Sequence, residues 1–243
     1  PELDGLRAIT VLAVIAYHVP ESRTLVRSGF IGVDVFFALS GALITRLLLV
    51  ELDQSGRIAL GRFYIRRLRR LYPGLLAMLT FVVVSAVVLY DSATVMRVLK
   101  NAVIAGLYLA SFVQPYQPMP NLGHMWSLSI EEVFYLVWPV ALWLLFRSST
   151  RAILGFLLVV VLAVFGWRVH LYLEDFATAS RIYFALDTRI DALAFGCIAG
   201  VLVHTGWAKR RKIALVFAAP IAALALAVLA VTADRAAVWY ATW

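Results

Sequence analysis

The chain of 243 residues is 63% hydrophobic and 15% charged, with a mean hydropathy of +0.89. Soluble domains average about 45–50% apolar and roughly 25% charged residues, so this composition excludes an ordinary soluble protein. The 22 Lys and Arg residues exceed the 14 Asp and Glu residues, which gives a net charge of +8. Because the basic residues gather between apolar segments, the positive-inside bias explains them, and we expect no nucleic-acid partner.

Long apolar segments predict an all-α, polytopic transmembrane helical bundle. The runs at 75–90, 133–146, 152–167 and 213–232 are each near the ~20 residues needed to cross a bilayer core of about 30 Å. None of them alternates as a barrel strand does. We place spans at residues 6–19, 30–50, 75–90, 127–146, 152–171, 184–204 and 213–232.

The apolar segment 102–113 is too short for a comfortable span, and we expect it to lie at the interface or to re-enter. If it crossed, the basic run 209–212 would lie on the opposite side of the membrane from the arginines of 57–70, against the positive-inside rule. The preferred arrangement puts the N-terminus and the basic loops in the cytoplasm. It then predicts that the membrane separates the arginines from the intramembrane carboxylates and His18, which lie toward the outer face.

Ionisable residues within apolar helices are costly and often mark function. Arg7 and His18 are eleven residues apart, which places them on one stripe of a helix, and histidine suits general base catalysis near neutral pH. Arg7 could equally anchor the helix at the headgroups, with His18 a simple span-end residue. Asp34 could cap its helix or orient His18, and Ser40 lies beside Gly41 where helices can approach closely.

The segment 63–73 is dense in arginine and interleaved with aromatic residues. Its arginines could contact anionic lipid headgroups, or Arg66, Arg67 and Arg70 could form a phosphate site, since guanidinium groups pair bidentately with phosphate oxygens. Nucleic-acid binding is the least favoured of the three interpretations, because the arginine cluster lies against the bilayer.

Two further acidic pairs lie in apolar surroundings. Glu131 and Glu132 point about 100° apart on a helix, so at least one should meet a buried cation or a water-filled cavity. Asp187 and Asp191 share a helix face with Arg189 turned away, and a structural charge network explains them better than a catalytic centre does. Cys197 is the only cysteine, and no His, Cys and carboxylate set has metal-ligand spacing, so we expect neither a disulfide nor a metal.

Taken together, these segments resemble the acyltransferase-3 family of membrane proteins. The resemblance rests on five blocks in order across nearly the whole chain. They are Arg-x10-His at Arg7 and His18, the segment from Gly32 to Gly41, Phe63 with the arginines and Pro73, Trp126 to Tyr135, and Asp187-x-Arg189-x-Asp191.

The resemblance implies an enzyme that carries an acyl group, commonly acetyl, from acyl-CoA across the membrane to a hydroxyl of a carbohydrate or lipid-linked glycan. No bound cofactor is implied. The family has about ten spans, so we expect residues 1–243 to be a single membrane acyltransferase domain that is truncated at its C-terminal end and belongs to a longer protein. The expected location is the inner (plasma) membrane.

By this resemblance His18 would deprotonate the acceptor hydroxyl, with Asp34 or Glu131 and Glu132 orienting it and Arg7 holding charge on the donor side. The acyl-CoA phosphates would bind Arg66, Arg67 and Arg70. Ser40, Trp126, Tyr135, Asp187, Arg189 and Asp191 would support the site. The alternatives are an acyl-enzyme on His18 or Ser40, a proton-coupled transporter that uses the same buried charges, and a non-catalytic assembly partner.

Overall fold

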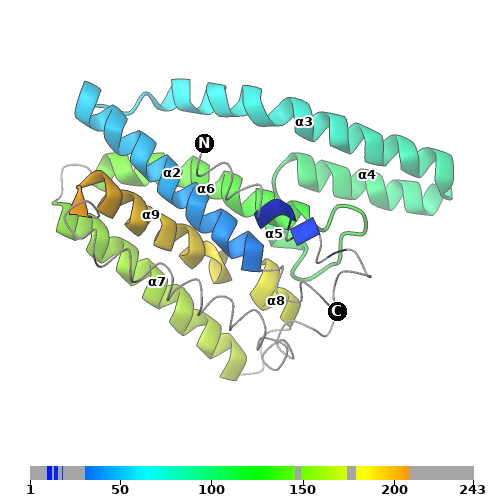
Figure 1. The fold of residues 1–243 in the computed structure, drawn as a ribbon. Coiled ribbons are helices and arrows are strands. Elements are labelled where there is room, and N and C mark those ends of the chain that lie inside the picture. Colours follow the sequence, from blue (N-terminus) through cyan, green and yellow to red (C-terminus); the bar gives the residue numbers. More distant parts are fainter. Residues whose placement is uncertain are drawn as a thin grey trace. The chain divides into compact units, whose positions relative to one another are not determined.

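The computed structural model describes residues 10–12, 14, 15, 18, 31–145, 149–173 and 179–207 (Figure 1). Its described regular structure is entirely helical, which confirms the all-α prediction. Residues 10–12, 14, 15 and 18 are helical. The helices that follow are α2 (Ile31–Ser55), α3 (Leu60–Leu89), α4 (Ser92–Gly106), α5 (Ala110–Val113), α6 (Met125–Leu145), α7 (Thr150–Leu173), α8 (Ala179–Phe184), the 3-10 turn η2 (Leu186–Thr188) and α9 (Ile190–His204).

Four of the described helices are long and apolar enough to cross a membrane. They are α2, α3, α6 and α7, and they coincide with the predicted spans 30–50, 75–90, 127–146 and 152–171. The chain is therefore a multi-pass membrane protein. The predicted span 213–232 lies outside the described residues, as does most of 6–19.

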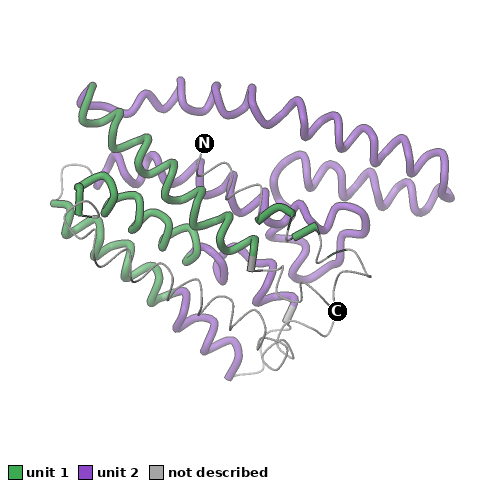
Figure 2. Tube along the Cα trace, in the orientation of Figure 1, with its two compact units in different colours: residues 1–54, 148–163, 191–243 green, residues 55–147, 164–190 purple. Residues whose placement is uncertain are grey.

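The chain forms two compact units, one made of residues 1–54, 148–163 and 191–243 and the other of residues 55–147 and 164–190 (Figure 2). In the first unit, α2 and α9 pack backbone against backbone. A Cβ atom on Gly196 would collide with the carbonyl oxygen of Ala38, and one on Gly41 with that of Leu193. Small residues at this crossing are therefore required, as expected for close helix packing in a membrane.

The predicted span 184–204 is wrong as a single helix. The chain breaks between α8 and α9, and α9 alone has only 15 residues. The Thr188 hydroxyl donates to the carbonyl oxygens of Ile182 (2.8 Å) and Ala185 (3.0 Å), so a side chain satisfies carbonyl groups where α8 ends. Asp187 and Asp191 consequently lie in different elements and not at i,i+4 on one helix. Hydropathy averages over such a break and does not detect it.

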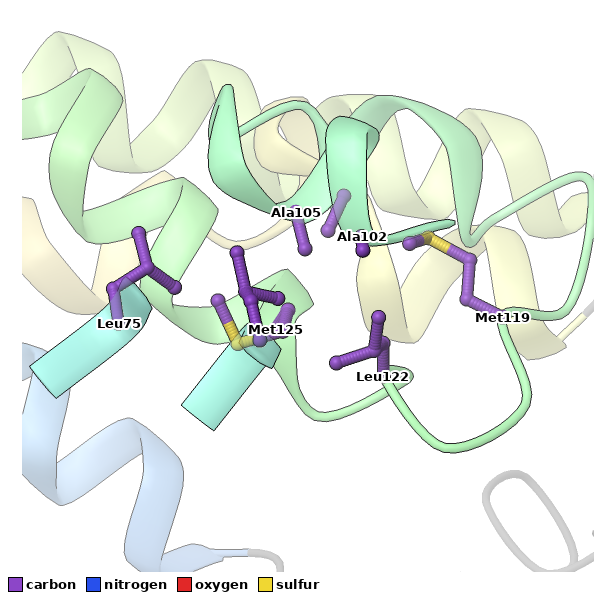
Figure 3. Close-up of a cluster of buried hydrophobic side chains, with 8 residues drawn as sticks. Leu75, Ala102, Ala105, Met119, Leu122 and Met125 are labelled. Atoms are coloured by element: carbon purple, nitrogen blue, oxygen red, sulfur yellow. The ribbon is translucent and has the colours of Figure 1, made fainter. Parts of the chain in front are cut away.

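In the second unit, α3 and α4 form an antiparallel hairpin. The segment 102–113 does not form one helix, because α4 ends at Gly106 and Tyr108 adopts a left-handed backbone (φ 57°) before the short α5. Apolar side chains from the hairpin pack against the loop that precedes α6, as Figure 3 shows. This cluster comprises Leu75, Leu79, Ala102, Ala105, Ala110, Met119, Leu122 and Met125.

Gly196→Ala tests the α2–α9 packing. The added methyl group meets backbone that can move only with the helix, so we expect a loss of about 1–3 kcal/mol in stability. Gly155→Ala is the matched control, since its Cβ would meet open space. Thermal unfolding of the purified protein in detergent measures both, and equal midpoints for the two variants would contradict the packing.

Candidate functional site

An ion pair joins α3 to α6 in the second unit. Arg67 donates from Nε (3.0 Å) and Nη2 (2.8 Å) to Oε1 of Glu132. The two side chains are only 19% and 16% exposed. The guanidinium carbon also lies 3.1 Å from the ring centroid of Tyr135, one helical turn along from Glu132. A planar, weakly hydrated guanidinium suits this combination of carboxylate and aromatic ring.

This ion pair contradicts the predicted separation of the arginines from the carboxylates, which is wrong for Glu132. The positive-inside argument treats Arg67 as part of a basic loop. In the structure α3 begins at Leu60, so Arg67 belongs to a helix that runs antiparallel beside α6. The Tyr64 hydroxyl donates to the Leu136 carbonyl (2.8 Å) one turn further along the same contact. The sequence predicted that at least one of Glu131 and Glu132 meets a buried cation or a water-filled cavity. For Glu132 the partner is a cation, Arg67 of α3.

The other arginines of the block differ from Arg67 in their surroundings. Arg66, Arg69 and Arg70 are exposed, whereas Arg67 is half-buried against α6. Arg66 and Arg70 are four residues apart and share one face of α3. The predicted phosphate-binding set therefore divides into an exposed pair that could reach an anion and one arginine already held by a carboxylate.

A cavity of about 410 Å³ lies beside the ion pair, between α3, α6 and the turn after α4. We call it the Tyr108 cavity. Its lining is mostly apolar, apart from the Arg67–Glu132 pair and four phenol groups. The lining residues are Tyr64, Arg67, Leu68, Leu71, Tyr72, Leu107, Tyr108, Leu109, Glu132, Val133, Tyr135 and Leu136.

Tyr108 is a site residue that the sequence did not reveal. Its left-handed backbone costs about 1–2 kcal/mol for a residue with a side chain. Ser129 holds the turn, because its hydroxyl donates to the Tyr108 carbonyl and lies 2.8 Å from the Ser111 hydroxyl. The Tyr108 ring packs edge-to-face on Tyr72 with centroids 5.9 Å apart. No composition or spacing rule marks a tyrosine for this conformation.

The Tyr108 hydroxyl stays protonated at neutral pH. Burial raises the pKa of Tyr108 to about 12, and the nearby negative charge of Glu132 adds to the rise. A phenol in this state is a hydrogen-bond donor and not an anion.

Three of the predicted supporting residues, Trp126, Asp187 and Arg189, also lie in this unit. Arg189 lies over the rings of Tyr183 (4.7 Å) and Trp126 (5.8 Å), so Trp126 and Arg189 do come together. Asp187 instead accepts two hydrogen bonds from Arg181 (2.7 and 2.5 Å).

Asp187 also accepts a hydrogen bond from Trp167 at 2.9 Å. Burial alone would raise the pKa of Asp187, but the bonds from Arg181 and Trp167 outweigh it and lower that pKa. The carboxyl is therefore an ion at neutral pH, which agrees with the predicted charge network.

Glu131 is buried, next to Glu132 on α6. The Tyr135 hydroxyl lies 3.5 Å from its carboxylate, at the limit of a hydrogen bond. The two adjacent glutamates thus point in different directions, as their helical spacing predicts. Tyr135 links them, because its ring stacks on Arg67 while its hydroxyl points to Glu131.

Four of the predicted residues that the structure describes lie in the first unit. Asp34 occupies the first turn of α2, where a carboxylate interacts favourably with the helix N-terminus, and Ser40 is fully buried. Nδ1 of His18 lies 2.8 Å from the Val14 carbonyl oxygen. A carbonyl only accepts, so Nδ1 carries the hydrogen and the lone pair of the neutral ring is on Nε2. Asp191 is buried in the first turn of α9. Arg7 lies outside the described residues.

Within the described part of the chain, no group of three or more His, Cys, Asp or Glu side chains could hold a metal ion. Cys197 is buried and is a free thiol.

Comparison with known proteins shows the relatives of this chain. A family model described as an acyltransferase domain matches residues 1–243. A Staphylococcus aureus (strain COL) protein, named provisionally as an O-acetyltransferase, is 41% identical over 214 residues, which is 83% of this chain and 34% of the relative. The peptidoglycan O-acetyltransferase OatA of Listeria monocytogenes is 38% identical over 209 residues, 81% of this chain and 33% of the relative.

The O-acetyltransferase OatA of S. aureus strain NCTC 8325 is 36% identical over 209 residues, 82% of this chain and 34% of the relative. The chain therefore spans about a third of the length of the curated relatives it matches. No solved structure matches the chain significantly.

A double-mutant cycle tests the Arg67–Glu132 pair. Glu132→Leu leaves a guanidinium without its carboxylate and should destabilise the protein, whereas Arg67→Leu with Glu132→Leu should recover part of the loss. We expect a coupling of about 1–3 kcal/mol from thermal unfolding of the four proteins. The exposed Arg66→Leu in place of Arg67→Leu is the control, and coupling as large with Arg66 would contradict the pair.

Proposed function

The chain belongs to the acyltransferase-3 family, and from this membership we propose that the protein is an integral membrane O-acyltransferase. It transfers an acyl group, acetyl above all, from acyl-CoA to a hydroxyl of a cell-envelope glycan. The family match over residues 1–243 carries this proposal, and the names of the O-acetyltransferase relatives support it.

The donor binds with its phosphates against α3. Arg66 and Arg70 supply the contacts, because both are exposed on one face, and Arg69 lies exposed beside them. Arg67, which the sequence grouped with them, holds Glu132 instead and keeps α3 and α6 in register. Guanidinium groups are well suited to phosphate oxygens, and three of them balance much of the charge of a CoA tail.

His18 is the general base. Its hydrogen bond to the Val14 carbonyl fixes the tautomer, so Nε2 removes the proton of the acceptor hydroxyl. The acceptor oxygen then bonds to the thioester carbonyl carbon, the carbon–sulfur bond breaks, and the CoA sulfur leaves with its electron pair and takes the proton from His18. Asp34 orients this histidine, and Arg7 holds charge on the donor side.

The acceptor is a hydroxyl of a cell-wall glycan. The Listeria relative is named for peptidoglycan, which makes a glycan of the peptidoglycan class the first acceptor to test. The protein works in the plasma membrane with its N-terminus in the cytoplasm, where acyl-CoA is made, and delivers the acyl group to the outer face.

His18→Ala should abolish acetyl transfer, because the hydroxyl loses the base that takes its proton. A general base contributes about 10²–10⁴-fold to rate. Membranes that contain the full-length protein receive labelled acetyl-CoA, and ester-linked label in the glycan is measured. His170→Ala is the matched control, since that ring stacks on Trp167 at a helix end. Normal acetyl transfer by a folded His18→Ala protein would contradict the assignment of His18 as general base. Uptake of substrate without acylation would favour the alternative function, a proton-coupled transporter.

Arg66→Ala with Arg70→Ala should raise the KM for acetyl-CoA by about a hundredfold or more, since two charge-assisted hydrogen bonds of about 1.5–3 kcal/mol each are lost. The acceptor KM should stay the same. Arg97→Ala with Lys100→Ala, a pair of exposed cations on α4, is the control. An unchanged donor KM in the Arg66/Arg70 protein would place the phosphates elsewhere.

A further inference from the structure

In the Tyr108 cavity, one phenol hydroxyl has no protein acceptor among the residues that the structure describes. Three of its four phenol hydroxyls are directed at protein acceptors: Tyr64 and Tyr72 at backbone carbonyl oxygens (2.8 and 3.3 Å) and Tyr135 at a glutamate oxygen (3.5 Å). Among the described residues, the hydroxyl of Tyr108 donates to no such acceptor. This hydroxyl is therefore available to a bound molecule.

The backbone that carries this hydroxyl is strained. A glycine would adopt the left-handed conformation at no cost, whereas a tyrosine there is an outlier that persists only because its surroundings hold it. Ser129 supplies that hold through the Tyr108 carbonyl, and the Ser111 amide donates to Ser129 Oγ at 3.2 Å. Strain of this kind collects at functional sites, and here its effect is to direct the tyrosine ring to the cavity.

The walls of the cavity limit what can bind. The Glu132 carboxylate repels an anionic group, and the Arg67 guanidinium is already paired, so the bound end of a ligand is uncharged. Leu71, Leu107 and Leu109 supply apolar walls. A carbonyl oxygen that accepts from Tyr108, on a short apolar chain, meets these conditions.

The exposed cations next to the cavity indicate what the rest of the ligand carries. Arg66, Arg69 and Arg70 lie on the same turns of α3 as the cavity residues Leu68 and Leu71. A ligand with its uncharged end in the cavity would extend past these guanidinium groups, which favour phosphate. A carbonyl on a short chain, joined to phosphates, describes a short acyl thioester of coenzyme A.

We propose that the Tyr108 cavity binds the acyl-thioester end of the donor, with the Tyr108 hydroxyl donating to the thioester carbonyl oxygen. This inference rests on the proposed function and adds to it the place of the acyl group and the residue that recognises it. A bilayer lipid chain is the competing occupant, since Leu68, Leu107 and Leu136 at the cavity are exposed.

Comparison of acetyl-CoA with free CoA isolates this contact. The two ligands share every phosphate, so their affinity ratio reports only the acetyl end. Binding of each to the purified full-length protein is measured by calorimetry. Tyr108→Phe, which keeps the ring against Tyr72, should reduce the preference for acetyl-CoA about fivefold and leave CoA affinity unchanged, as expected for one hydrogen bond. Tyr90→Phe, an exposed tyrosine outside the cavity, is the matched control.

Two other variants separate the possible outcomes. Tyr108→Gly suits the left-handed backbone, so it should fold and lose the preference as well. Arg66→Ala with Arg70→Ala should weaken acetyl-CoA and CoA equally. A wild-type protein that binds both ligands equally, or a Tyr108→Phe protein that keeps the preference, overturns the inference alone and leaves the cavity to lipid. A wild-type protein that binds neither ligand overturns the proposed function itself.

Discussion

The contact between α3 and α6 depends on one charge pair in apolar surroundings. Arg67 and Glu132 are both mostly hidden from solvent, and each would be costly to bury without the other. Together with the Tyr135 ring they fix which turn of α3 faces which turn of α6. The cavity beside the pair and the turn at Tyr108 are built on that register, so loss of either charge would disturb more than one side chain.

The sequence predicted the helices better than it predicted their partners. Spans matching α2, α6 and α7 follow from run length alone, because twenty apolar residues have few alternatives in lipid. The helix α3 extends well beyond its predicted apolar span, because hydropathy ends a span at its charged residues while the helix does not. The same averaging hides the break between α8 and α9, where the Thr188 hydroxyl donates to carbonyl oxygens at the end of α8.

The sequence indicated several of the residues that form the site, but it did not indicate which of them contact one another. Arg67 and Glu132 are both visible in the sequence as charges that need an explanation, but loop charge counting placed them on opposite sides of the membrane. Tyr108 gave no signal, because a left-handed tyrosine is set by the tertiary contacts of Ser111 and Ser129. The roles proposed for His18 and Asp34 come from family resemblance and helix position, and they remain predictions.

The most direct test of this account is whether α3 and α6 face each other at these residues in the membrane. A full-length protein with Arg67→Cys, Glu132→Cys and Cys197→Ser is treated in membranes with a short bifunctional maleimide, and the linked product is detected by protease mapping. We expect a cross-link between positions 67 and 132 that neither single cysteine gives. Labelling of the two cysteines from opposite sides of the membrane, with no cross-link, would contradict it.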